Sequence, residues 1–387
     1  MKEKTVRKTL IFSLLLMVLV IWIGSDTCLR RIVFFGMADV YDYKHLPVRE
    51  ISASEKVFTF VRGNSVNTFP VDSIKYGNRY LKDPETIISG RRTTAFLVIR
   101  NDTLIYEKYF NGHTRETPCK IFSITKNVIS GLIGIAQSRG YITSIDDPVS
   151  RYIPELEGKD TGKITIQQCL NGTAGIRYDG SYFPWSDEAK MYYKPDIRSL
   201  LLKICLEAEP GTRFRTENYS AQLLGFVLER ATGMSVSAFL EKILWTRIGT
   251  EYPAMFVLDS EEHGFEKTES GLVVRPVDLA KFGRLMLHNG QWDGAEIIPA
   301  SWVHASTTYT TADSLGLNWS SGTKKEYYKN MWWGFSENGS LDRYSANGHF
   351  FQRLYISPGK NVIVIRLGTD GSGVSWGRFI SSLIHEL

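Results

Sequence analysis

Residues 121–136 read IFSITKNVISGLIGIA and place a serine and a lysine, Ser123 and Lys126, at the start of an apolar run. The run predicts a buried helix, and positions i and i+3 of a helix share one face, about 5–6 Å apart between Cβ atoms. The Lys126 ammonium can therefore reach the Ser123 hydroxyl at the helix start, where unpaired N–H groups favour a developing negative charge. We expect the fold to be organised around this helix.

The Ser123 hydroxyl becomes a useful nucleophile only when a base takes its proton. Lys126 can be that base if burial lowers its pKa. A structural interpretation also fits, in which Ser123 caps a core helix and Lys126 extends into water. The pattern S-x-x-K is not specific by itself, because Ser321 and Lys324 repeat it in a polar stretch.

The chain has 387 residues, of which 43% are hydrophobic and 12% aromatic, as expected for a globular protein with a sizeable core. The net charge of +5 comes partly from four basic residues within the first eight positions. We therefore expect no nucleic-acid partner.

The N-terminus predicts export. Residues 1–8 form a basic tail, and residues 9–25 form an uncharged apolar run that is either a membrane anchor or a signal sequence. No clear cleavage site follows, which favours an anchor. The basic flank places the tail in the cytoplasm and the rest outside, so we expect a single-pass membrane protein with a periplasmic or extracellular catalytic domain.

The cysteines and histidines predict neither a metal site nor a cofactor. Four cysteines, at positions 28, 119, 169 and 205, are too few and too scattered for a disulfide scaffold. Most are expected to be buried thiols, although one bridge among Cys119, Cys169 and Cys205 would be compatible with an oxidising compartment.

The remaining sequence predicts an α+β domain. Residues 26–88 are expected to form an irregular stem with one strand at 56–61, and residues 89–387 the domain. One hairpin is expected at 94–100 and 103–110, and another at 353–357 and 362–367, followed by a closing helix at 376–386. Helices are expected between them, at 165–170, 196–206, 218–232, 235–248 and 276–287. An antiparallel sheet built from both chain ends, flanked by helices and with a mostly helical lobe inserted, accounts for this order.

Several motifs in this order carry a family resemblance. These are the segments IFSITK (121–126), DDPV (146–149), GTAG (172–175), PGTRF (210–214), LLG (223–225), ERATG (229–233) and DLAKFGRLMLHNG (278–290), with IIP and Trp302 after 296. Over about residues 90–387 the chain resembles serine hydrolases related to class C β-lactamases and penicillin-binding proteins, and most of all the 6-aminohexanoate-dimer hydrolase branch. The resemblance implies a β-lactamase/transpeptidase-like fold and acylation of Ser123, with Lys126 as base.

The resemblance also implies a second motif, Tyr-x-Asn or Tyr-x-Ser, at residues 216–218. Asn218 fits and is a predicted catalytic residue, whereas Thr216 stands where the tyrosine is expected and is a predicted substrate-binding residue. Asn218 could equally be a helix N-cap. The missing phenol leaves two alternatives: Lys126 works with water, or Tyr178, Tyr182 or Tyr219 supplies the proton. The aromatic loop from Tyr178 to Trp185 is a candidate substrate-facing segment.

The third family element is a strand beside the serine, and residues 347–352 are its best counterpart. Gly348 and His349 are therefore predicted near the oxyanion, with the His349 amide completing the oxyanion hole together with the amide of Ser123. Lys-Thr-Gly, which often forms this element, is absent from the chain. His349 could also be an ordinary strand residue.

The sequence thus predicts a membrane-anchored serine hydrolase that cleaves an amide or ester bond in a small molecule or short peptide. Two alternatives stay open. One is a D-Ala-D-Ala carboxypeptidase or β-lactamase, and the other is a catalytically impaired relative that binds cell-wall peptide, motivated by Thr216. A Ser-His-Asp triad on an α/β-hydrolase fold is disfavoured because the chain has no Gly-x-Ser-x-Gly motif.

Overall fold

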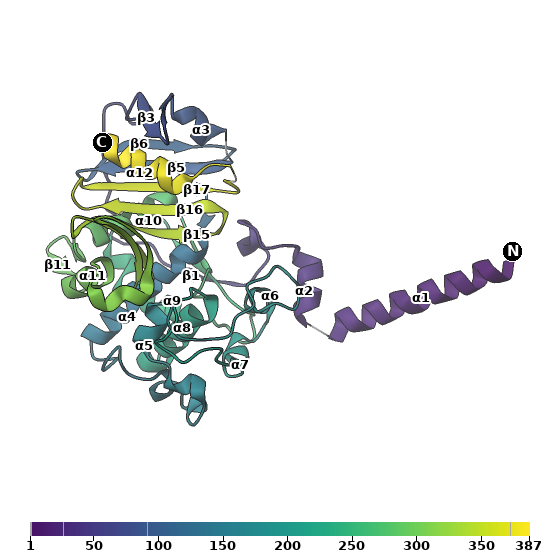
Figure 1. The fold of residues 1–387 in the computed structure, drawn as a ribbon. Helices are drawn as coiled ribbons and strands as arrows, with labels where there is room; N and C mark the ends of the chain where they lie inside the picture. Colours follow the sequence, from purple (N-terminus) through teal and green to yellow (C-terminus); the bar gives the residue numbers. More distant parts are fainter. Residues whose placement is uncertain (1, 26, 91, 372) are drawn as a thin grey trace.

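The computed structural model describes residues 2–25, 27–90, 92–371 and 373–387. Met1 and Asp26, where the predicted tail and stem begin, lie outside these ranges. Figure 1 shows a large sheet at one end of the molecule, a helical lobe at the other, and a long N-terminal helix that projects away from both.

The large sheet joins the two ends of the domain. Within the described residues it has nine strands, antiparallel except for one parallel pair between β2 and β6. Their order in space is β12 (Leu317–Ser321), β13 (Lys324–Lys329), β14 (Trp332–Glu337), β15 (Ser340–Gly348), β16 (Gln352–Ser357), β17 (Val362–Gly368), β5 (Thr93–Arg100), β6 (Thr103–Tyr109) and β2 (Val61–Arg62). The neighbouring pair β17 and β5 confirms the predicted sheet, because one strand comes from each end of the domain.

Strand β5 is buried on both faces, and each face packs against a different layer. Phe96 and Val98 contact the closing helix α12 (Trp376–Glu386), α3 (Glu85–Ser89) and the hairpin of β3 (Ser73–Tyr76) and β4 (Arg79–Lys82). Leu97 and Ile99 belong to the main core with the helical lobe. The alternation follows from strand geometry, in which successive side chains point to opposite faces.

Helix α4 (Thr125–Ser138) lies between the sheet and the lobe and is buried on all sides over most of its length. The lobe also contains α5 (Ile166–Leu170), α6 (Asp187–Tyr193), α7 (Ile197–Leu201), α8 (Asn218–Thr232) and α9 (Val236–Ile243). Helices α10 (Pro276–Leu287) and α11 (Ala300–Thr307), and the hairpin of β10 (Gln291–Trp292) and β11 (Ala295–Glu296), complete the domain. Helices α8 and α10 have the predicted bounds, whereas α7 and α9 end earlier than predicted.

The predicted stem is folded onto the domain. Its strand β1 (Val48–Ile51) is the edge of a second sheet, followed in space by β8 (Ala254–Val257), β9 (Leu272–Val274) and β7 (Cys119–Lys120). Helix α2 (Thr27–Phe35) packs against α6. The stem looked irregular in sequence because its strands are short and because β1 and β2 pair with strands far along the chain, β8 and β6, whereas β3 and β4 pair with each other.

The four cysteines are free thiols, so the bridge considered among Cys119, Cys169 and Cys205 is absent. Helix α1 (Lys2–Ser25) covers the predicted anchor and exposes apolar side chains such as Leu10 and Phe12. In the described part of the chain, no single helix is long and apolar enough to cross a membrane; α8 and Val236–Arg247 meet this test only as a pair bent by 72°. This finding does not support the predicted anchor.

Gly134 allows α4 and α11 to pack closely, and a substitution there tests this contact. A Cβ at Gly134 would lie 2.4 Å from ring atoms of the buried Trp302. We expect Gly134→Ala to lower the free energy of unfolding by about 1–3 kcal/mol, because the overlap outweighs the better helix propensity of alanine. Urea denaturation measures the change. Gly359→Ala is the matched control, since a Cβ there meets no atom within 4 Å; an equal midpoint for both variants would contradict the expectation.

Candidate active site

Ser123 lies in a short 3-10 turn, Phe122–Ile124, that connects β7 to α4. The turn is held by hydrogen bonds from the Ile121 amide to the Leu272 carbonyl, at 3.1 Å, and from the Ile124 amide to the Ile121 carbonyl, at 3.3 Å. The N-cap of α4 is Ile124 and has no side-chain cap, so Ser123 does not cap the helix. Its hydroxyl lines a pocket instead.

Phe122, immediately before Ser123, has a positive φ of 48°, which is strained for a bulky residue. Its ring is buried and packs edge-on against the rings of His349, at 5.6 Å, and Phe350, at 5.4 Å. Phe350 also has a positive φ, 56°. Residues in such conformations persist only where surrounding contacts enforce them, and they cluster at functional sites.

Lys126 points inward. Its Nζ donates a hydrogen bond of 3.4 Å to the backbone carbonyl of Glu217. Burial lowers the pKa of Lys126, while the carboxylates of Glu217, Glu188 and Glu269 oppose that decrease without reversing it. The interpretation in which Lys126 extends into water is therefore wrong, and the lowered pKa is what a general base requires.

Asn218 is the first residue of α8 and belongs to a polar cluster. Its side-chain amide donates hydrogen bonds to the Tyr178 hydroxyl, at 3.0 Å, and to Glu188 Oε2, at 2.9 Å. The Tyr178 hydroxyl donates to the same Glu188 oxygen at 2.5 Å. The N-cap of α8 is Glu217, whose carboxylate accepts from the Ser220 amide, so the N-cap interpretation of Asn218 is wrong.

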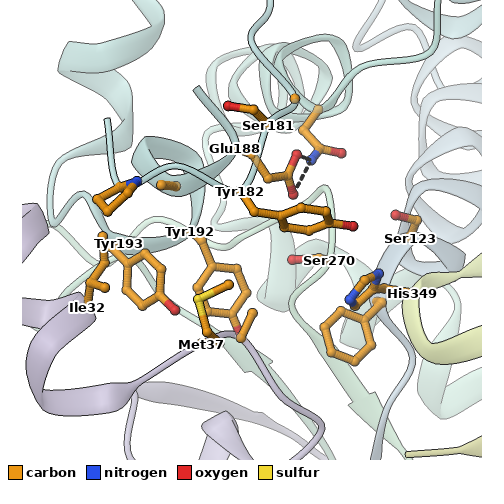
Figure 2. Close-up of a pocket in the computed structure, with 16 residues that line it drawn as sticks. Ile32, Met37, Ser123, Ser181, Tyr182, Glu188, Tyr192, Tyr193, Ser270 and His349 are labelled. Atoms are coloured by element: carbon orange, nitrogen blue, oxygen red, sulfur yellow. Dashed lines mark hydrogen bonds between the residues drawn. The ribbon is translucent and has the colours of Figure 1, made fainter. Parts of the chain in front are cut away.

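The three phenols that could replace the missing tyrosine differ in position. Tyr182 lines the pocket, and Figure 2 shows its ring lying across the pocket with the hydroxyl oriented toward Ser123. Tyr178 and Tyr219 are buried, pack edge-on at 5.1 Å and are not among the lining residues. Burial raises the pKa of both groups, and neighbouring carboxylates raise it further.

Thr216 and Gly348 do not line the pocket either. Thr216 is exposed at the residue before the α8 N-cap, so its predicted contact with substrate stays a prediction. Gly348 ends β15, and a Cβ there would lie 2.5 Å from the Ile121 carbonyl oxygen. Only glycine allows this strand to approach the turn that carries Ser123 so closely.

His349 follows Gly348 and lines the pocket beside Ser123 (Figure 2). Burial lowers the pKa of His349; the Glu188 carboxylate raises it and Lys120 lowers it further, so the ring is neutral at neutral pH. The participation of its amide in an oxyanion hole stays a prediction.

A buried lysine that the sequence analysis missed lies behind the pocket. The Lys120 ammonium donates a hydrogen bond to the Tyr192 hydroxyl, which in turn donates to Asp42, and it lies 4.6 Å from the centre of the Phe122 ring. Burial lowers the pKa of Lys120 to about 8, against the opposing effect of Asp42. The sequence signal that could have identified Lys120 was its position between Cys119 and the apolar run that begins at Ile121.

The pocket has a volume of about 370 Å³ and is built from six separate parts of the chain. The lining residues are Ile32, Met37, Ala38, Phe122, Ser123, Gly180, Ser181, Tyr182, Pro184, Glu188, Ala189, Tyr192, Tyr193, Asn218, Ser270 and His349. The predicted residues Ser123, Asn218 and His349 thus face one cavity. Glu188 and Ser270 were not predicted, because isolated polar residues in loops and short helices give no periodic signal.

The lowered pKa of Lys126 predicts how the reactivity of Ser123 depends on pH. Only the neutral amine can accept a proton, and its fraction rises as the pH passes through the pKa of the folded protein. Labelling of Ser123 by a fluorophosphonate should therefore accelerate with pH and level off below 10.5, the usual pKa of lysine. Lys126→Arg, which stays protonated, should label slowly with no such rise. A rise centred at or above 10.5, or one retained in Lys126→Arg, would contradict the assignment.

Comparisons with known proteins identify the family. A family model described as Beta-lactamase matches residues 85–375. The 6-aminohexanoate-dimer hydrolase of Paenarthrobacter ureafaciens is 23% identical over 304 residues, which cover 75% of this chain and 76% of that protein. A provisionally named D-alanyl-D-alanine carboxypeptidase of Salmonella paratyphi B is 25% identical over 191 residues, 43% of this chain and 44% of that protein.

Solved structures show the same fold. A Bacillus anthracis protein, provisionally named a 6-aminohexanoate-dimer hydrolase, has a TM-score of 0.77 and 22% identity, covering 89% of this chain and 93% of that one. A class C beta-lactamase has a TM-score of 0.59 and 17% identity, covering 78% of this chain and 93% of that one. The resemblance seen in the sequence motifs and the predicted fold are thereby confirmed. Because the family model matches most of the chain, the protein belongs to the beta-lactamase family.

Proposed function

We propose that the protein is a serine hydrolase that cleaves an amide or ester bond through an acyl-enzyme on Ser123. The observation that carries the proposal is the pairing of Ser123, which lines a pocket, with Lys126, whose buried amine has a lowered pKa and lies one helical turn away. The family and the relatives named as hydrolases agree with this chemistry.

In the proposed reaction, Ser123 Oγ attacks the substrate carbonyl carbon while Lys126 Nζ accepts the hydroxyl proton. The carbonyl oxygen becomes an oxyanion, which the amides of Ser123 and His349 would stabilise. The bond to the leaving group then breaks, and that group takes the proton that Lys126 accepted, directly or through a phenol, so that the Lys126 amine is neutral again. Water attacks the resulting ester on Ser123, and its proton returns through Lys126 as the free hydroxyl forms again.

The relatives suggest two kinds of substrate, short amides and cell-wall peptides. The alternative is a protein that binds cell-wall peptide without cleaving it. It is favoured by the absence of the family tyrosine, since Thr216 stands at that position. Export of the domain, with a membrane-bound N-terminus, stays a prediction from the sequence.

Two serine variants separate these alternatives. Ser123→Ala should abolish hydrolysis of p-nitrophenyl esters and labelling by a fluorophosphonate, because the nucleophile is removed. Ser321→Ala is the matched control from the second S-x-x-K pattern: Ser321 is exposed at the end of β12 and does not line the pocket, so activity should be unchanged. Equal losses in the two variants, or a wild-type protein without turnover or labelling, would refute the proposal.

Tyr182 is the phenol best placed to protonate a leaving group. An amine leaving group needs this help more than an alkoxide does, and such a proton transfer is worth about 10²–10⁴-fold. Tyr182→Phe should therefore reduce kcat for an anilide at least about tenfold more than kcat for the matched phenyl ester. Tyr80→Phe, at an exposed tyrosine on β4, is the control. Selective loss of anilide turnover in Tyr178→Phe, with Tyr182→Phe unaffected, would show that the role belongs to Tyr178.

A further inference from the structure

The segment before the catalytic domain reaches the pocket. Ile32, on α2, and Met37 and Ala38, in the loop after it, line the same cavity as Ser123. Figure 2 shows Ile32 and Met37 on the side of the pocket away from Ser123 and His349, with Tyr182 between them. We call these three residues the N-terminal wall.

Polar contacts on both sides hold the N-terminal wall in place. Arg31 Nη1 donates hydrogen bonds to the carbonyls of Tyr193, at 3.2 Å, and Asp259, at 2.6 Å. The Tyr193 hydroxyl donates to the Gly36 carbonyl at 2.5 Å. Cys28 is buried with Tyr192 and Tyr193 in a hydrophobic cluster of their own. Arg31 and Gly36 are thus both hydrogen-bonded to Tyr193 at the end of α6, and the segment that they belong to forms part of the pocket.

The other end of the wall is attached to the residues behind the nucleophile. Asp42 accepts hydrogen bonds from the Tyr192 hydroxyl and from the Asp39 amide, the latter at 2.8 Å, and lies 4.0 Å from Lys120. Lys120 in turn lies under the Phe122 ring, next to Ser123. Contacts through Asp42, Tyr192 and Lys120 therefore connect the segment of the wall to the turn that carries Ser123.

The chemistry of the lining differs between its two ends. Around Ser123 the groups are polar, whereas the N-terminal wall and its neighbours Pro184 and Ala189 are apolar. Among the described lining residues there is no lysine or arginine, and the carboxylate present is that of Glu188. A carboxylate placed against the N-terminal wall would contact apolar side chains and no cationic lining residue, which is unfavourable wherever the contact removes its water.

We propose that the N-terminal wall determines substrate specificity: it accepts an uncharged, apolar chain on the substrate and rejects one that ends in a carboxylate. The proposal rests on the proposed hydrolase function of the same pocket. It assigns to this protein apolar esters or amides, rather than penicillins or peptides with a free carboxyl end.

Three p-nitrophenyl esters test the proposal in the full-length protein: the acetate, the hexanoate and the adipate half-ester, whose chain matches the hexanoate but ends in a carboxylate. The wild type should have the highest kcat/KM for the hexanoate, about tenfold or more above the adipate. Ile32→Ala should lower the ratio of hexanoate to acetate kcat/KM about tenfold, because apolar contact area is lost. Met37→Lys should shift the ratio of hexanoate to adipate toward the adipate, because it supplies a cation.

Val33→Ala is the matched control on α2, since Val33 is exposed and does not line the pocket, and it should leave both ratios unchanged. Binding of hexananilide and its ω-carboxylate analogue to the Ser123→Ala variant, followed by calorimetry, tests the wall without turnover. A lower Kd for the hexananilide than for its ω-carboxylate analogue supports the proposed role of the N-terminal wall. This outcome is independent of turnover, so it can hold even if the hydrolase proposal fails. Equal Kd values, or ratios that change as much in Val33→Ala as in Ile32→Ala, would overturn it.

Discussion

Burial of the Lys126 amine is the constraint on which the rest of the site depends. In the proposed mechanism Lys126 acts as a base, which a protonated surface lysine cannot do at neutral pH; the chain surrounds this lysine with low-dielectric protein. Helix α4 does so by lying between the sheet and the helical lobe, with buried residues along almost its whole length. The carboxylates of Glu217 and Glu269 lie in the same interior, and burial raises the pKa of each. These carboxylates oppose the decrease in the pKa of Lys126 without reversing it.

The second constraint is the geometry of the turn that carries Ser123. Phe122 is held at a positive φ, and the rings of His349 and Phe350 pack against it. Gly348 brings the end of β15 against the Ile121 carbonyl, which leaves no space for a side chain. The site is therefore assembled where the sheet and the lobe meet, and the local strain is maintained by contacts from both.

The N-terminal segment supplies part of the pocket. The family model begins at residue 85, yet residues 28–46 supply a wall of the cavity and a buried acid, Asp42, behind the nucleophile. The family model establishes the family and the solved structures show the fold, but neither identifies the substrate. Specificity in such a pocket depends on which groups line it, and three of these, Ile32, Met37 and Ala38, come from outside the residues that the family model matches.

The sequence by itself determined the two hairpins, the closing helix, α8, α10 and the spacing of one helical turn between Ser123 and Lys126. These are local patterns, in which the period of the apolar residues or a fixed spacing on one helix carries the information. Motif order also predicted the family, and it placed Asn218 and His349 near Ser123 correctly. Only the tertiary structure decided that Lys126 points inward, that Glu217 rather than Asn218 caps α8, and that Tyr182 rather than Tyr178 or Tyr219 lines the pocket. It also decided that Glu188, Lys120 and the N-terminal wall belong to the site. Each of these depends on which distant segments meet in space, and the local order of residues does not specify such contacts.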